Sequence, residues 1–221
     1  MDKGLTPYLL VIAPVLMFIA FMMGPEEEVY GQEYIDDLKD VEQNAILMET
    51  LLMTVATILT IGSWFILTQD MMAKSNKMQR DLLMISRVAL VIPLTILLLA
   101  TGLVLDAHYL VTEGEDDYLT VDQENDIALN NHYISSYMWG TLPMSWGLGL
   151  VLIGAAGLVG NQKDEHSEQW VFAGPVVAGL GMMTVYWTSA WMFFMLAIVI
   201  NLPIGVMMLM GKLDYLYSEE I

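Results

Sequence analysis

The chain has 221 residues, of which 56% are hydrophobic, yet its formal net charge is -18. Its eight lysines and arginines are scattered and cannot neutralise a phosphate track, which excludes nucleic-acid binding. The absence of cysteine excludes disulfides and thiolate metal sites. The apolar residues gather in long blocks with the acids between them. This pattern predicts an all-α, polytopic transmembrane helical bundle that forms one integral membrane domain over residues 1–221.

The apolar blocks predict six membrane spans, because a helix needs about 20 apolar residues to cross a bilayer. The last block, residues 171–211, is long enough for two spans, and we divide it at Thr188 and Ser189, where aromatic residues gather as they do at membrane boundaries. The alternative is five spans with a long kinked or re-entrant final segment. The six predicted spans are residues 5–23, 45–68, 82–105, 137–160, 171–187 and 190–211.

The positions of lysine and arginine predict the orientation, since these residues accumulate on the cytoplasmic side of a membrane protein. With six spans, only Lys39 falls on the outer side. We therefore expect a multi-pass protein of the cell (plasma) membrane, in contact with the lipid bilayer, with both termini cytoplasmic. The basic residues on the predicted inner side are Lys3, Lys74, Lys77, Arg80, Arg87, Lys163 and Lys212.

The two predicted outer loops hold most of the acidic residues. In the first, residues 24–44, helical spacing of apolar residues predicts an amphipathic helix that begins near Gln32, rests near the interface and runs into span two. In the second, residues 106–136, Thr120 and Gln123 form a capping-box pattern that predicts a short helix from Val121. This negative surface is suited to attract cations or a basic partner. The alternative is a solvated outer face.

Few ionisable residues lie inside the predicted spans. Glu49 lies about one turn into span two and begins a face that continues with Thr60 and Ser63, which suits a polar transport path. No charged residue continues this path at mid-membrane, which argues against a proton relay. The alternative is that Glu49 reaches back to the outer interface. Arg87 enters span three from the inside and is expected to reach the inner interface or a lipid phosphate.

Asn201 is the most central polar side chain of the predicted spans. Pro203 and Gly205 follow it, and this sequence suits a broken helix at a solute or ion site. The alternative is a kinked helix in which Asn201 bonds to a neighbouring helix.

Small residues in spans four and five predict close helix packing, inside the monomer or against a partner. The glycines that we expect at these contacts are Gly149, Gly154, Gly157, Gly174 and Gly181.

Two histidines lie at the ends of the second outer loop. His108, His132 and Asp106 would suit Zn²⁺ or Cu²⁺ if the two ends meet at the outer membrane surface. The alternative is that both histidines form ordinary interfacial pairs with the neighbouring tyrosines, Tyr109 and Tyr133.

These features favour a non-catalytic integral subunit of a larger membrane complex, bound to other membrane subunits or to itself. The spans hold no histidine for a haem, no paired acids and no nucleophile with a base, so catalysis by this chain alone is not expected. A redox or energy-converting complex is the natural host. One alternative is a small cation or neutral-solute transporter or channel that uses Glu49, Thr60 and Asn201. Another is a metal-dependent enzyme at the outer surface.

Overall fold

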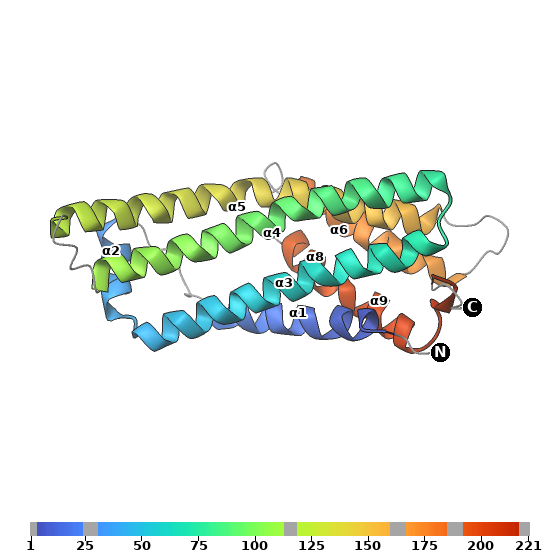
Figure 1. The fold of residues 1–221 in the computed structure, drawn as a ribbon, viewed down its shortest axis with the longest axis horizontal. Helices are drawn as coiled ribbons and strands as arrows, with labels where there is room; N and C mark the ends of the chain where they lie inside the picture. The colour runs from blue at the N-terminus through green and yellow to red at the C-terminus, as the bar shows by residue number, and fades with distance from the viewer. Residues whose placement is uncertain (1–3, 24–30, 113–118, 160–166, 185–191, 217–221) are drawn as a thin grey trace.

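The structure is a computed structural model that describes residues 4–23, 31–112, 119–159, 167–184 and 192–216. Its regular elements are all helices, which confirms the all-α prediction, and Figure 1 shows their arrangement. The α-helices are α1 (Thr6–Met23), α2 (Gln32–Asp40), α3 (Gln43–Ala73), α4 (Lys77–Thr112), α5 (Val121–Leu158), α6 (Ala173–Met183), α8 (Met192–Val199) and α9 (Asn201–Leu209). Two short 3-10 helices, η1 (Ser167–Phe172) and η2 (Asp214–Leu216), complete the set.

Five helical stretches of the described chain are long and apolar enough to cross a membrane, which indicates a multi-pass membrane protein. They are α1, α3, α4, α5 and the stretch Met192–Leu209 that α8 and α9 share. The predicted span 171–187 corresponds to the end of η1 and to α6, which has 11 residues and is too short to cross alone. The predicted turn at residues 188–189 lies outside the described residues.

The long helices are longer than a bilayer is thick. At 1.5 Å per residue, the 36 residues of α4 and the 38 of α5 span about 54 and about 57 Å, against about 30 Å of hydrocarbon. Figure 1 shows α4 and α5 side by side along the whole molecule, with α6, α8 and α9 at one end and α2 at the other. Helices of this length extend beyond the hydrocarbon region of a bilayer. We call the end that carries α2 the outer head, after the predicted topology.

The second predicted outer loop is mostly helix. Helix α4 continues to Thr112, and α5 begins at Val121 as the capping box predicts, since Thr120 and Gln123 each bond the other's backbone N–H. However, this helix is not short, because it runs unbroken through Tyr137, where span four was predicted to begin. Its packing along α4 explains why a charged, water-exposed segment stays helical.

Helix α2 confirms the predicted helix from Gln32, but its partner differs from the prediction. Val41 has an extended backbone (φ -78°, ψ 126°), so α2 ends there and does not run into α3. Tyr34, Ile35 and Leu38 form its buried face, which packs against α4 and α5 instead of the membrane interface. This face joins Ile46, Ala107 and Ala128 in a small second core inside the outer head.

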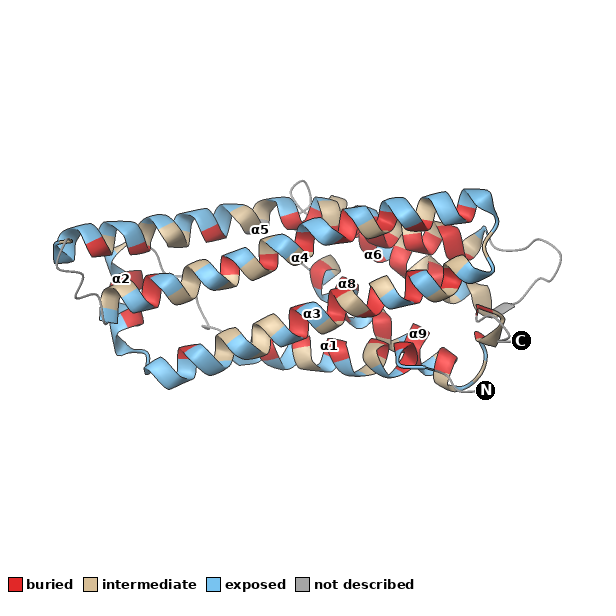
Figure 2. Cartoon of the chain, in the orientation of Figure 1, coloured by how far each residue is buried: buried red, intermediate tan, exposed pale blue. Residues whose placement is uncertain are grey.

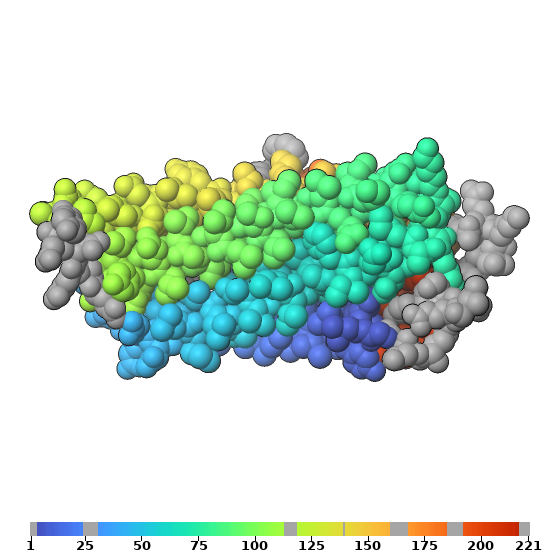
Figure 3. All heavy atoms as spheres, in the orientation of Figure 1, coloured from blue at the N-terminus to red at the C-terminus, as the bar shows by residue number. Residues whose placement is uncertain are grey.

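The main core lies in the membrane part of the bundle. Figure 2 shows buried residues concentrated in the half of the molecule where α6, α8 and α9 lie, and more widely spaced along the outer head. There α6 packs against α5, α8 against α6, and α9 against α1. In Figure 3, side chains of α3 and α4 form a continuous surface along the face in view. Large apolar side chains such as Val88 of α4 remain exposed on the outside of the bundle, as a lipid-facing surface requires.

The final span is interrupted where the sequence predicted a break. Helix α8 ends at Val199 and α9 begins at Asn201, with Ile200 between them. Pro203 lacks an N–H and cannot bond to the carbonyl of Val199, which is the physical reason for the interruption. Ile200 keeps right-handed helical angles (φ -63°, ψ -15°), so the two helices form one slightly irregular rod.

Candidate functional site

The three predicted metal ligands lie in the outer head but make separate contacts. His108 is 2% exposed, and its Nε2 lies 3.2 Å from the carbonyl oxygen of Val41. A carboxylate oxygen of Asp106 accepts a hydrogen bond of 2.8 Å from Nδ2 of Asn131. Within the described ranges, no three His, Asp or Glu side chains are placed to hold a metal ion. The residues present therefore do not form the predicted Zn²⁺ or Cu²⁺ set.

His132 stacks on Tyr34 of α2, with 3.9 Å between ring centroids and 27° between the ring planes. The predicted neighbour, Tyr133, is farther away, at 5.9 Å and a tilted angle. Burial raises the pKa of Tyr34 to about 12. Its hydroxyl has no hydrogen-bond partner among the described residues. The stack and the contact of His108 with Val41 both fasten α2 and its following turn to the long helices.

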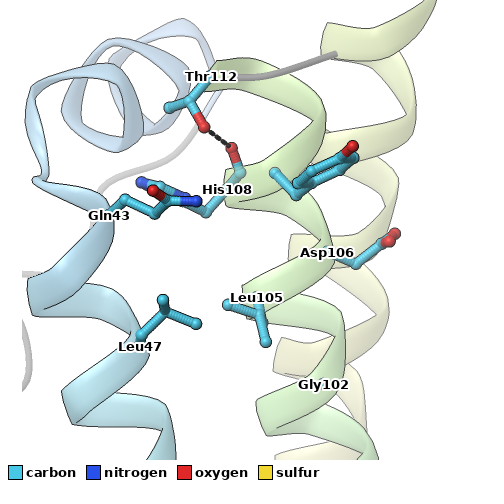
Figure 4. A pocket seen from close by; sticks show the side chains of 8 residues that line it. Gln43, Leu47, Gly102, Leu105, Asp106, His108 and Thr112 are labelled. Atoms are coloured by element: carbon cyan, nitrogen blue, oxygen red, sulfur yellow. Dashed lines mark hydrogen bonds between the residues drawn. The ribbon is translucent and has the colours of Figure 1, made fainter. Parts of the chain in front are cut away.

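A groove of about 340 Å³ lies between the parts of α3 and α4 nearest the outer head, and no sequence pattern predicted it. Figure 4 shows Leu47 of α3 and Leu105 of α4 pointing toward each other across it, with Gln43 and His108 about one turn farther out. Its lining is apolar toward the membrane and polar toward the outside. The residues that line it are Gln43, Leu47, Gly102, Leu105, Asp106, His108, Tyr109 and Thr112.

Inside the bundle, a chain of hydrogen bonds connects α9, α3 and α1. Nδ2 of Asn201 donates to Oγ of Ser63 at 3.2 Å, and Ser63 donates in turn to the carbonyl of Thr60 at 2.7 Å. Oγ1 of Thr60 donates to the carbonyl of Ala13 at 3.4 Å. All three side chains are fully buried. Such bonds between membrane helices each contribute about 0.6–2 kcal/mol.

The structure brings Thr60 and Asn201 to one place but does not bring Glu49 there. Glu49 lies 11 residues before Thr60 on α3, which is about 16 Å along the helix axis. It is half-buried near the outer end of α3. One polar atom of Asn201 is not used in this chain of bonds, since its Oδ1 has no hydrogen-bond partner among the described residues. The indole nitrogens of Trp64 and Trp146 are also buried, and neither has a hydrogen-bond partner among the described residues.

The predicted packing glycines lie at close helix contacts. A Cβ added at Gly154 would come within 2.6 Å of the Phe172 carbonyl oxygen, and one added at Gly157 would overlap the Phe172 ring. A Cβ at Gly149 would come within 2.8 Å of a Leu90 methyl group. Gly174 and Gly181 lie against Ile200 and Phe193 of the final span.

The closest approach of two helix backbones joins α5 and α6. Gly147 of α5 lies against Gly179 of α6, where backbone meets backbone. Both belong to the runs of small residues that predict close packing of spans four and five. The glycines as a group let η1 and α6 lie close to α5, and α8 lie close to α6.

The end of the bundle opposite the outer head carries further polar contacts between helices. Arg87 of α4 donates to the side chain of Gln69 of α3 at 3.0 Å, on the surface, and lies over the Phe65 ring at 5.5 Å. Buried Gln79 donates to the carbonyl of Ala156 at 2.9 Å and so connects α4 to the end of α5.

Comparison with known proteins supplies no functional lead. The chain matches no protein-family model, and no curated protein or solved structure is significantly similar to it. Among the described residues, the features that bear on function are the buried polar side chains inside the bundle, the acidic outer head and the groove between α3 and α4.

Proposed function

We propose that this chain is a non-catalytic integral membrane subunit of a larger complex in the plasma membrane. The observation that supports this proposal most strongly lies in the interior of the bundle. Its polar side chains, Thr60, Ser63 and Asn201, are neutral and fully buried, and they bond to one another and to backbone. Such bonds stabilise a helix assembly and supply neither a nucleophile nor a proton acceptor.

The proposed topology has six spans with both termini cytoplasmic. Lys74, Lys77 and Arg80 lie at the turn between α3 and α4, at the end of the molecule where the described chain begins and ends. Lys39 lies at the opposite end, in α2. This distribution supports a cytoplasmic location for the end with the chain termini. A sixth span also explains how the termini share that side.

The outside of the bundle is wide and apolar, which suits contact with lipid and with other membrane helices. Helix α4 is the least covered of the candidate spans, with only 28% of its most apolar window buried. Positions on other helices are similarly open, such as Ile12 of α1 and Val177 of α6. We infer that at least one of these faces is covered by another subunit in the complex.

Photo-crosslinking in native membranes tests this proposal. A photoreactive phenylalanine analogue would replace Val88 of α4, Ile12 of α1 or Val177 of α6, which are 68%, 50% and 55% exposed. We expect at least one position to crosslink to a protein of different sequence in high yield. Leu142 of α5, which is fully buried, is the control position and should crosslink only within the chain. Adducts with lipid or a second copy alone, from all three exposed positions, would contradict the proposal.

A second candidate function, transport of a small neutral solute or cation, is favoured by the unpaired atoms around the bundle centre. The Oδ1 of Asn201 and the indole nitrogens of Trp64 and Trp146 are buried without partners among the described residues. Buried polar atoms of this kind bind water or another small polar species. In liposomes, Asn201→Ala should then change solute flux, with Glu49→Gln as the test of an outer entry. Flux equal to that of empty liposomes would remove this candidate.

A further inference from the structure

The groove between α3 and α4 lies where the molecule changes from an apolar to a polar environment. On α4, residues 88–105 carry no charge, and Asp106 begins the polar part of the helix. The groove extends across this boundary from Gly102 to Thr112, which is about 15 Å along the helix axis. A molecule that fills it must therefore be amphiphilic.

The inner half of the groove suits a hydrocarbon chain. Leu47 and Leu105 point toward each other across it, as Figure 4 shows. Gly102 lies about one turn before Leu105, inside the apolar part of α4, and a Cβ added there would meet no atom within 4 Å. The space beside Gly102 is therefore open to a hydrocarbon chain.

The outer half of the groove offers uncharged hydrogen-bonding groups. The side-chain amide of Gln43 both donates and accepts. The hydroxyl of Thr112 donates to the carbonyl of His108 at 2.8 Å, so toward a bound molecule it acts as an acceptor. The carbonyl of Val41 can only accept, so the proton of the neutral His108 ring lies on Nε2, and Nδ1 is then an acceptor. A head group with hydroxyls can both donate to the acceptors of the groove and accept from the Gln43 amide. A phosphate can only accept, so it would leave the acceptors of the groove without partners.

The charges around the groove exclude an anionic head and give no bond for a cationic one. No lysine or arginine lines the groove, and Lys39 is the only base in the described part of the outer head. The one carboxylate in the lining, Asp106, bonds to Asn131 of α5 and in Figure 4 points away from Leu47 and Gln43. The negative charge of Asp106 repels an anion, and no basic side chain of the lining compensates for it. A cationic head beside Gln43 and Leu47 would face no carboxylate, because that of Asp106 is turned toward Asn131.

We propose that this groove binds an uncharged lipid that carries hydroxyl groups. Its hydrocarbon lies along Leu47, Leu105 and Gly102, and its hydroxyls bond to Gln43, Thr112 and His108. A volume of about 340 Å³ holds a head group and the first part of a chain, with the rest extending into the bilayer. Both a diacylglycerol and a quinol have this chemistry. The site is independent of whether the chain works alone or in a complex.

Native mass spectrometry of the full chain in an amine-oxide detergent, which has no hydroxyl group, tests the proposal. The probes are dioleoylglycerol, a decyl-substituted benzoquinol and dioleoylphosphatidylglycerol, which shares the chains of the first but carries a phosphate. We expect one or both uncharged probes to bind about tenfold more tightly than the anionic one, the ratio that one well-made hydrogen bond supplies. The first two probes distinguish a glycerolipid from a redox lipid.

Two glycine variants separate the groove from the rest of the surface. Gly102→Leu fills the open space and should weaken binding of the uncharged probe by about tenfold. Gly62→Leu on α3 is the matched control, since Gly62 also has no atom within 4 Å of an added Cβ but does not line the groove. Thr112→Val keeps the side-chain volume, removes a hydroxyl and should weaken binding severalfold. Equal binding by both glycine variants, or no preference for uncharged probes, would overturn the proposal.

Discussion

Replacing Gly147 with alanine should separate two helices that now touch through their backbones. An added Cβ at Gly147 would lie 2.6 Å from the carbonyl oxygen of Gly179, and a Cβ at Gly179 would meet the carbonyl of Gly147 in return. Neither obstacle is the end of a flexible side chain. To restore an ordinary contact of 3.4 Å, α5 and α6 would have to move apart by roughly 0.8 Å, the difference between these two distances.

The size of the effect follows from two opposing contributions. Overpacking of this kind costs about 1–3 kcal/mol. Alanine regains up to about 1 kcal/mol because it is a better helix former than glycine. We therefore expect Gly147→Ala to lower the free energy of unfolding by about 1–2 kcal/mol. The Cβ of Gly62→Ala would meet no atom within 4 Å. Only the gain in helix propensity remains there, so the free energy of unfolding should rise by about 0.5–1 kcal/mol.

Reversible unfolding in mixed micelles measures both variants. Increasing amounts of dodecyl sulfate would unfold the protein, and far-ultraviolet circular dichroism would follow the loss of helix. The midpoint for Gly147→Ala should fall below that of the original chain, and the midpoint for Gly62→Ala should lie at or above it. If the two variants unfold at the same midpoint, the contact between α5 and α6 is not as close as described, and the packing argument fails.

Three further changes probe other parts of the account. Ser63→Ala and Asn201→Ala, combined in a double-mutant cycle of unfolding free energies, should show a coupling of about 0.6–1 kcal/mol, and additivity would refute their hydrogen bond. Because burial raises the pKa of Tyr34 to about 12 from 10.0, folding favours the neutral phenol, and stability should fall as pH rises from 10 to 12. Tyr34→Phe should lose part of this pH dependence, and an unchanged profile would contradict the burial of the hydroxyl. Thr120→Ala should speed amide hydrogen exchange at Gln123 by loosening the start of α5, at a cost of about 1 kcal/mol, whereas unchanged exchange would show that the cap is dispensable.

Much of the membrane part could be predicted because bilayer thickness and hydrophobicity alone determine it. The break near Asn201 and the cap at Thr120 also follow from local chemistry, since proline and the capping box act within one helical turn. The length of α5 could not be predicted in this way. Its charged residues suggested a loop, although charges are normal on a helix that continues into water.

The buried face of the outer part of α5 shows where the apolar pattern failed. Ile127 and Ile134 are large apolar residues of this segment, yet they are 37% and 46% exposed. The side toward α2 and α4 instead holds Ala128, Glu124 and Ser135, which are small or polar. Close approach of the helices favours small residues there. The size of the side chains, and not their hydrophobicity, therefore decides which side of α5 is buried.

The candidate site could be predicted only in part, because its contacts join residues that are far apart in sequence. Asn201 was identified as a bonding residue, but its partner, Ser63, lies 138 residues away in sequence and depends on how α9 crosses α3. His108 bonds to a backbone carbonyl, which has no side-chain signature. The groove likewise depends on the separation of two helices, which no local pattern encodes.

The most direct test of the central claim is the composition of the particle that contains this chain. The protein, tagged at its C-terminus and expressed at native abundance, would be extracted in a mild detergent and its mass measured by native electrophoresis and mass spectrometry. The account predicts a particle well above the 24.8 kDa of one chain, with membrane proteins of different sequence at fixed stoichiometry. A particle that holds only this chain, as a monomer or homo-oligomer, would contradict it.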